Sequence, residues 1–80
     1  MEVLKSFGLK CKELRNQRKL SQDKFALLIG MDRSYYAAVE LGKRNISLSN
    51  IAKIAQGFGI SLSAIFEDVE IENGEEERSI

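Results

Sequence analysis

Arg33 and Ser34 place two hydrogen-bonding side chains at one expected helix end. They follow Asp32 directly, and aspartate is a good N-cap, so both residues belong to the first turn of that helix. An arginine guanidinium can donate to O6 and N7 of a guanine, and a serine hydroxyl can donate or accept beside it. These two residues are therefore candidate readers of DNA base edges.

The next residues of the same expected helix would allow close approach to a DNA groove. Ala37 and Ala38, one turn on, present methyl-sized surface that could touch a thymine methyl. Tyr35 could place its hydroxyl on a phosphate. The alternative is a solvated amphipathic helix whose outer face carries Arg33 by chance.

Two further features suit the phosphate backbone. Gln22 stands in the first turn of the preceding expected helix, where its amide and the free backbone N–H groups could meet one anion. Lys43, Arg44 and Asn45 form a polar loop after the helix of the candidate readers. Each feature alone is also typical of solvated surface. Together they flank one helix end that is suited to bases.

The residues from Leu20 to Arg44 predict two short helices that meet at a sharp turn. Ser21 is an N-cap for the first helix, and Gly30 suits the left-handed backbone at its end. Asp32 caps the second helix, which we expect to run to about Leu41. This is the plan of a helix-turn-helix, in which the second helix enters a major groove.

Helical spacing of apolar residues predicts three more helices. The first runs from about residue 3 to Arg18. Its apolar face consists of Leu4, Phe7, Cys11 and Leu14. No segment shows sustained period-two alternation, so we predict an all-α fold of five helices with the helix-turn-helix at helices 2 and 3.

The last two helices are marked by their caps and apolar faces. The fourth starts at Ser47 or Ser49, and Gly57 and Gly59 are expected to stop it. The fifth is short and begins after Ser61. Its apolar residues are Leu62, Ile65 and Phe66. These three could form dimer surface or simply core, and the sequence does not divide them.

The formal net charge of zero over 80 residues is a cancellation. Residues 1–66 hold 11 Lys or Arg against 5 Asp or Glu, a balance of +6, whereas residues 67–80 hold one Arg against 7 acids, a balance of −6. A basic globule suits a partner with a phosphate backbone. We expect a DNA-binding and dimerisation domain over 1–66 and a frayed acidic tail over 67–80, without a strand at Val69 and Ile71.

Several classes of function lack the residues they need. There is no histidine and one cysteine, so we expect no enzyme, no metal site and no cofactor, and Cys11 is most simply a buried filler. No apolar run approaches the roughly 20 residues of a membrane span, and the N-terminus lacks an apolar signal region. A cytoplasmic protein is therefore expected.

The chain resembles the lambda-repressor-like helix-turn-helix regulators of the Xre or Cro/cI type over roughly residues 7–66. The matching residues are Leu20, Ser21, Gln22, Phe25, Ala26, Gly30, Arg33, Ser34, Tyr35, Val39, Glu40, Gly42, Ile51, Ala55, Ile60, Ser61 and Phe66. Within that family, the segment DRSYYAAVELGKRNIS over 32–47 is most similar to the controller proteins of restriction–modification systems.

The resemblance implies a homodimer formed largely through the last helix and bound to a palindromic operator in double-stranded DNA. It implies that Gln22 contacts a phosphate or base edge and that residues 43 to 47, including Ser47, form a loop on the DNA backbone. It also implies a partly buried ion pair between Arg15 and Glu40 that ties the recognition helix to the scaffold. No small-molecule ligand is implied.

The sequence departs from the family pattern in two ways. Tyr36 stands where relatives usually have an aliphatic core residue, so its hydroxyl must find water or a partner. Ala37 and Ala38 replace longer polar readers, so DNA shape would contribute more to recognition. We expect a dimeric transcriptional regulator of restriction–modification genes. The alternative is an antitoxin-like or co-activator-bridging protein-interaction module on the same fold.

Overall fold

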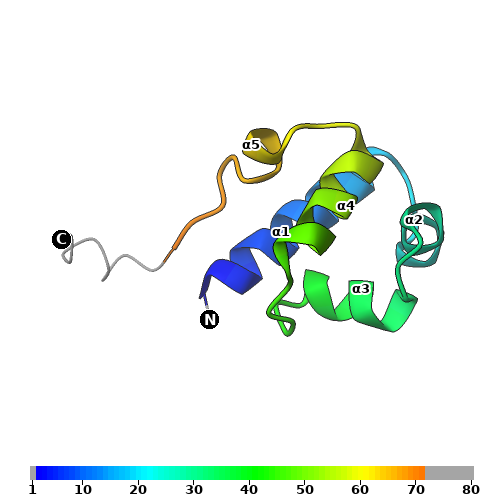
Figure 1. The fold of residues 1–80 in the computed structure, drawn as a ribbon, viewed down its shortest axis with the longest axis horizontal. Helices are drawn as coiled ribbons and strands as arrows, with labels where there is room; N and C mark the ends of the chain where they lie inside the picture. The colour runs from blue at the N-terminus through cyan, green and yellow to red at the C-terminus, as the bar shows by residue number, and fades with distance from the viewer. Residues whose placement is uncertain (1, 72–80) are drawn as a thin grey trace, which may run out of the picture.

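Five helices account for most of the structure, a computed structural model that describes residues 2–71. They are α1 (Glu2–Gln17), α2 (Gln22–Ile29), α3 (Arg33–Glu40), α4 (Leu48–Phe58) and α5 (Leu62–Ile65). Figure 1 shows α2 at one end of the molecule, α3 along its lower edge and α5 at its upper edge. No strand occurs among the described residues, so the all-α prediction is confirmed.

Serine and aspartate side chains start four of the helices. Ser21, Asp32 and Ser61 each accept a hydrogen bond from the backbone N–H three residues on, at 3.0 to 3.1 Å. Of the two candidates for α4, Ser47 is the cap, because its hydroxyl accepts from the N–H of Asn50 at 3.2 Å. Each cap satisfies a backbone donor that helix geometry leaves open.

Gly30 makes the turn between α2 and α3 as expected. Its φ of 68° is left-handed, and the N–H of Met31 donates to the carbonyl oxygen of Ala26 at 2.9 Å. A left-handed backbone conformation is strained for a residue with a Cβ, so glycine is favoured at this position. The turn changes the direction of the chain between α2 and α3, and Asp32 then starts α3.

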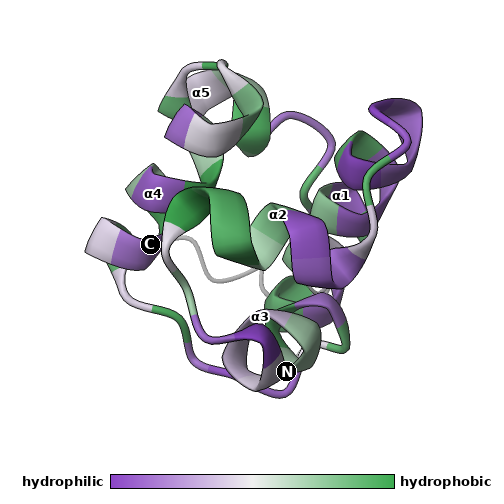
Figure 2. Ribbon diagram, turned by 90° about the vertical axis from the view of Figure 1, so that its right-hand side faces the viewer, coloured by the Kyte–Doolittle hydropathy of each residue, from purple (hydrophilic) through white to green (hydrophobic). Residues whose placement is uncertain are grey.

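Aromatic rings join the helices around one core. The ring of Phe25 on α2 stacks on that of Phe58 on α4, with centroids 4.1 Å apart, and meets the ring of Tyr36 on α3 edge-on at 5.2 Å. Helix α3 contacts α1 and α2, while α4 contacts α2 and α5. Coloured by hydropathy, α2 is hydrophilic at one end and hydrophobic at the other (Figure 2). Its polar start lies beside α3, where Asp23 pairs with Arg33.

Gly57 does not stop α4, contrary to expectation. The helix continues to Phe58 and ends at Gly59, whose φ is 73°. A Cβ at Gly57 would lie 3.1 Å from the ring of Phe25 and nearer still to the side chain of Ile29. This glycine therefore serves the close packing of α4 on α2, which its sequence neighbours do not reveal.

The first residues of the acidic segment, 67–71, contact the rest of the domain. Val69 packs against the core, and the N–H of Glu70 donates to the hydroxyl of Ser6 on α1 at 2.8 Å. Asp68, with φ 69°, turns the chain back toward α1. The backbone N–H groups of Glu67 and Val69 also donate to the carbonyl oxygens of Ala64 and Phe66, at 3.2 and 2.9 Å. Residues 72–80 lie outside the described part of the tail.

Candidate nucleic-acid interface

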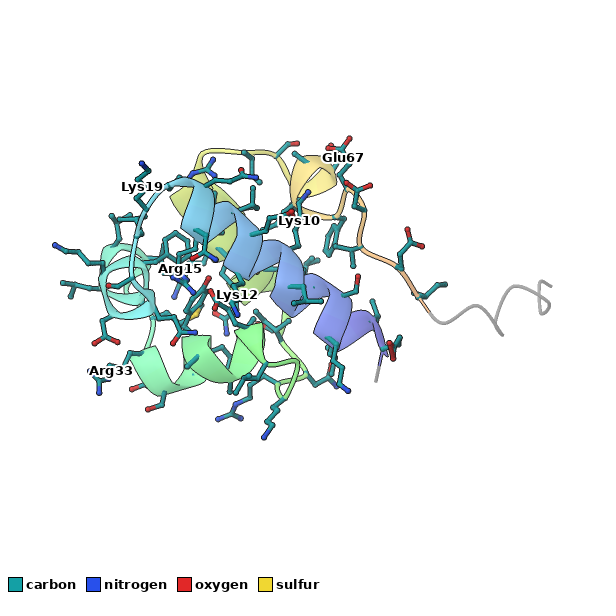
Figure 3. All side chains as sticks on the ribbon, turned by 180° about the vertical axis from the view of Figure 1, so that it is seen from behind. Lys10, Lys12, Arg15, Lys19, Arg33 and Glu67 are labelled. Carbon is teal, nitrogen blue, oxygen red and sulfur yellow. The ribbon has the colours of Figure 1, made fainter. Side chains whose placement is uncertain are left out.

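The first turn of α3 presents its side chains to solvent. Arg33 and Ser34 are both exposed, and Figure 3 shows Arg33 projecting away from the start of the helix. Nη1 of Arg33 donates to Oδ2 of Asp23 on α2 at 2.9 Å, in a pair whose side chains are 70% and 65% exposed. The candidate base readers therefore lie where a duplex could reach them.

The last residue of α3 is buried and held by α1. Nε and Nη2 of Arg15 donate to the two carboxylate oxygens of Glu40 at 2.7 and 2.9 Å, and Nη1 donates to the carbonyl oxygen of Leu20 at 2.7 Å. Only 8% of Arg15 and 6% of Glu40 is exposed. This is the ion pair that the resemblance implied, and its fork geometry fixes both partners.

Hydrogen bonds keep the buried Glu40 ionised. Burial by itself raises the pKa of a carboxyl group, but the donors that face Glu40, chiefly Arg15, hold its pKa below the ordinary value. The same hydrogen bond from Arg15 to Glu40 raises the pKa of the guanidinium. Both groups therefore remain charged at neutral pH, and each depends on the other.

Gln22 connects the ion pair to the surface. Its Nε2 donates to Oε1 of Glu40 at 2.8 Å, and the side chain is half-buried. An amide nitrogen carries two N–H groups, so one remains to donate to a phosphate. The predicted contact of Gln22 with DNA is compatible with this position, and Glu40 would fix the orientation of the amide.

Tyr35 joins α3 to α4 and to the loop after α3. Its hydroxyl accepts from Nδ2 of Asn50 at 3.2 Å, and the guanidinium of Arg44 lies 4.9 Å from the centroid of its ring. The hydroxyl proton is not used in that bond and could donate to a phosphate. Tyr35 is half-buried, as are Ala37 and Ala38.

The polar loop lies open to solvent. Lys43, Arg44 and Asn45 are exposed, and exposed Ser47 closes the loop as the cap of α4. The N–H of Lys43 donates to the carbonyl oxygen of Ala38 at 2.9 Å, which ties the start of the loop to α3. The loop's cations thus begin directly beyond the helix that carries the candidate base readers.

Two buried groups lie behind the interface. The ring of Tyr36 is fully buried, and within residues 2–71 its hydroxyl has no hydrogen-bond partner of regular geometry. Burial, followed by the neighbouring Glu40, raises the pKa of this hydroxyl. Cys11 is also fully buried, and burial together with the Glu40 carboxylate raises the pKa of its thiol to about 12. Both groups are therefore neutral parts of the core.

Two glycines set the position of α3. Sequence reasoning missed Gly8, and it included Gly42 among the residues of the family resemblance without its contact with α1. A Cβ on Gly8 would lie 2.5 Å from the carbonyl oxygen of Val39, and a Cβ on Gly42 would lie 2.7 Å from Cα of Lys5. Helices α1 and α3 can approach this closely only where a side chain is absent. A lone glycine inside a helical pattern is the signal that could have identified Gly8.

The candidate dimer residues separate by exposure. Ile65 is fully buried in the single chain and belongs to its core, whereas Leu62 is 41% and Phe66 39% exposed. The ring of Phe66 also lies 5.8 Å from that of Phe7. Leu62 and Phe66 are therefore the two of the three that offer surface to a second copy.

Among the described residues, no helix is long and apolar enough to span a membrane, and no group of three or more metal-ligating side chains is gathered.

Three comparisons relate this chain to known proteins. A helix-turn-helix family model, HTH_3, matches residues 12–65. The control protein C.MunI from Mycoplasma is 52% identical over 67 residues, which cover 82% of this chain and 90% of that protein. The crystal structure of the restriction–modification controller protein C.AhdI from Aeromonas hydrophila matches with 46% identity and a TM-score of 0.76, covering 79% of this chain and 96% of that one.

A more distant structure shares the fold. The controller protein C.Esp1396I, solved as a tetramer in complex with its natural 35 base-pair operator, is 24% identical with a TM-score of 0.78 and covers 84% of this chain and 88% of that one. The family model spans more than half of this chain, and C.MunI and C.AhdI match over most of their own lengths. The chain therefore belongs to the helix-turn-helix family and, within it, to the controller proteins of restriction–modification systems.

Proposed function

We propose that this protein acts in the bacterial cytoplasm as a homodimer that binds a palindromic operator and regulates restriction–modification genes. The observation that carries this proposal is the contrast along α3, whose exposed start bears Arg33 and Ser34 while its end is buried against α1. A helix held in this way can enter a major groove without losing its contacts with the scaffold.

The other contacts follow from the positions of the polar groups. Gln22 and Tyr35 would donate to phosphates beside the recognition helix, and Lys43, Arg44 and Ser47 would follow the backbone beyond it. Such contacts fix the register of the protein on the duplex. Base discrimination is left to Arg33 and Ser34, assisted by the close approach that the two alanines allow.

Dimerisation would set the spacing of the two recognition helices. Half-sites read by symmetric helix-turn-helix dimers lie about 34 Å apart, one turn of the duplex. Leu62 and Phe66 offer the apolar surface for this contact. Sedimentation of Leu62→Glu as a monomer, where the wild type sediments as a dimer, would support this surface, and an unchanged dimer would exclude Leu62 from it.

Selection of duplexes from a random pool with the purified protein tests the function directly. We expect a palindromic motif whose half-site separation matches one helical turn. If no sequence is enriched, sequence-specific binding is refuted and a protein-interaction module on this fold becomes the better explanation.

A pair of substitutions then separates readers from backbone contacts. Arg33→Ala should weaken the selected duplex and relax one base position, a loss of about 1–3 kcal/mol in discrimination. Lys43→Ala should weaken selected and random duplexes alike and make the salt dependence of binding shallower. Equal losses on both duplexes for Arg33→Ala would contradict its assignment as a reader.

A further inference from the structure

Arg33 does not stand alone at the start of α3. Its Nη1 donates at 2.9 Å to Oδ2 of Asp23, which belongs to the first turn of α2. The structure gives no second hydrogen bond to this guanidinium within residues 2–71. Nε and Nη2 therefore remain as an unoccupied pair of donors on the same rigid plane.

Asp23 places a negative charge on a globule whose net charge is positive. Residues 1–66 carry a net charge of +6, yet this carboxylate lies directly after Gln22 and beside the candidate reader. A carboxylate near a DNA backbone is repelled by phosphates, so at this position it lowers affinity for any duplex. An exposed ion pair of this kind also adds little to the stability of the fold.

A long arginine side chain must lose its rotamer freedom when it reads a base. An ion pair formed before binding removes part of that loss and sets the direction in which the remaining donors point. At the same time, the repulsion from phosphates acts on every sequence, whereas the aligned arginine helps only where a matching base is present. The two effects together increase the ratio of specific to non-specific binding.

We propose that Asp23 is a positioning and specificity-determining residue: it stays paired with Arg33 in the DNA complex and directs the Nε and Nη2 edge of the guanidinium at a base. This inference rests on the proposed function. It adds to that function a second residue, on the helix before the recognition helix, through which base discrimination is set.

The first measurement uses the full chain with the duplex selected from the random pool and a set of duplexes changed at each base pair. Asp23→Asn should lower discrimination at the base pair that Arg33 reads by about fivefold, which corresponds to ~1 kcal/mol, the upper range for an exposed ion pair. Binding to a random duplex should stay equal or become tighter. Glu13→Gln, which removes one exposed carboxylate from α1, is the control with the same change of net charge.

The second measurement is a double-mutant cycle with Arg33→Ala. In that background Asp23→Asn should leave discrimination unchanged, because the arginine that it positions is absent. Asp23→Glu should restore part of the lost discrimination, since a longer carboxylate can still pair with Arg33. Thermal unfolding of each variant verifies that the fold is intact.

Three outcomes would overturn the inference while leaving the proposed function in place. In the first, Asp23→Asn tightens binding to selected and random duplexes equally. In the second, Glu13→Gln changes discrimination as much as Asp23→Asn does. In the third, the effects of Asp23→Asn and Arg33→Ala on discrimination are fully additive. A selection that enriches no motif would instead refute the proposed function itself, so the two failures can be told apart.

Discussion

The two ends of α3 are built in opposite ways. At its end, Glu40 is 6% exposed and receives three hydrogen bonds from Arg15 and Gln22, and Gly8 lets the backbone of α1 come into contact. At its start, Arg33 is exposed and has one ion pair with a side chain that is itself exposed. One helix thus has an end that anchors it and an end that is free to meet a partner, and a substitution should affect stability or binding according to the end it changes.

Of the substitutions considered, breaking the buried ion pair should lower the stability of the protein most. Arg15→Met leaves Glu40 without its main partner, and we expect the free energy of unfolding in urea to fall by about 3–5 kcal/mol. The double variant Arg15→Met/Glu40→Leu removes both charges and should recover most of that loss. A double variant as unstable as the single one would show that the anchor depends on the ion pair itself rather than on avoiding an unpaired charge.

Adding one methyl group where α1 meets α3 should have the next largest effect. Gly8→Ala places a Cβ against backbone carbonyls that cannot move independently, so we expect a loss of about 1–3 kcal/mol despite the higher helix propensity of alanine. Asn16→Ala, at an exposed site of the same helix, should be neutral or slightly stabilising in the same thermal unfolding experiment. A stabilised Gly8→Ala would mean that the two helices separate readily.

Acid should remove the stabilisation that ionised Glu40 gives to the end of α3. The pKa of Glu40 is lowered in the folded protein, so the folded state binds fewer protons than the unfolded chain in this range. Its stabilisation is complete above the ordinary carboxyl pKa of about 4.3 and is lost as the pH falls through the lower folded value. Urea unfolding from pH 7 to 3 should thus lower the free energy of unfolding more for the wild type than for Arg15→Met/Glu40→Leu, and parallel curves would contradict the role of Glu40.

The exposed end should respond least. Arg33→Ala removes a solvent-exposed ion pair, and we expect the free energy of unfolding to change by about 1 kcal/mol or less. Its effect should be visible in DNA binding instead. Calorimetry of the free protein measures the first quantity, and a loss of stability comparable to that of Arg15→Met would erase the distinction between the two ends.

Local signals in the sequence predicted the start of α3 better than its end. Asp32, Ser21 and Gly30 act through backbone atoms three or four residues away, so their types alone identified the caps and the turn. The anchored end depends on residues far apart in the chain. The resemblance implied the pair of Arg15 and Glu40. A glycine within the helical pattern of α1 was a signal at Gly8, but it does not reveal that the contact is with the end of α3.

Two features that the local sequence did not indicate have the same physical cause. Gly57 lies inside α4 because its lack of a side chain leaves room for the ring of Phe25. Val69 is ordered because its side chain packs against the hydrophobic core. In both cases a tertiary contact overrides the local preference. The hydrogen bond from Arg33 to Asp23 also depends on tertiary structure. The two residues are ten positions apart, and their side chains can pair only because of the angle at which α2 and α3 meet.

The buried position of Cys11 allows thiol labelling to measure how often the core opens. The sequence holds one cysteine, and its thiol is fully buried with a pKa raised to about 12, so an alkylating reagent can react only after the core opens. The labelling rate at neutral pH then measures how often that opening occurs. Since a ligand that binds only the folded form suppresses opening, the same rate would report occupancy by an unlabelled duplex from inside the protein, with the interface untouched.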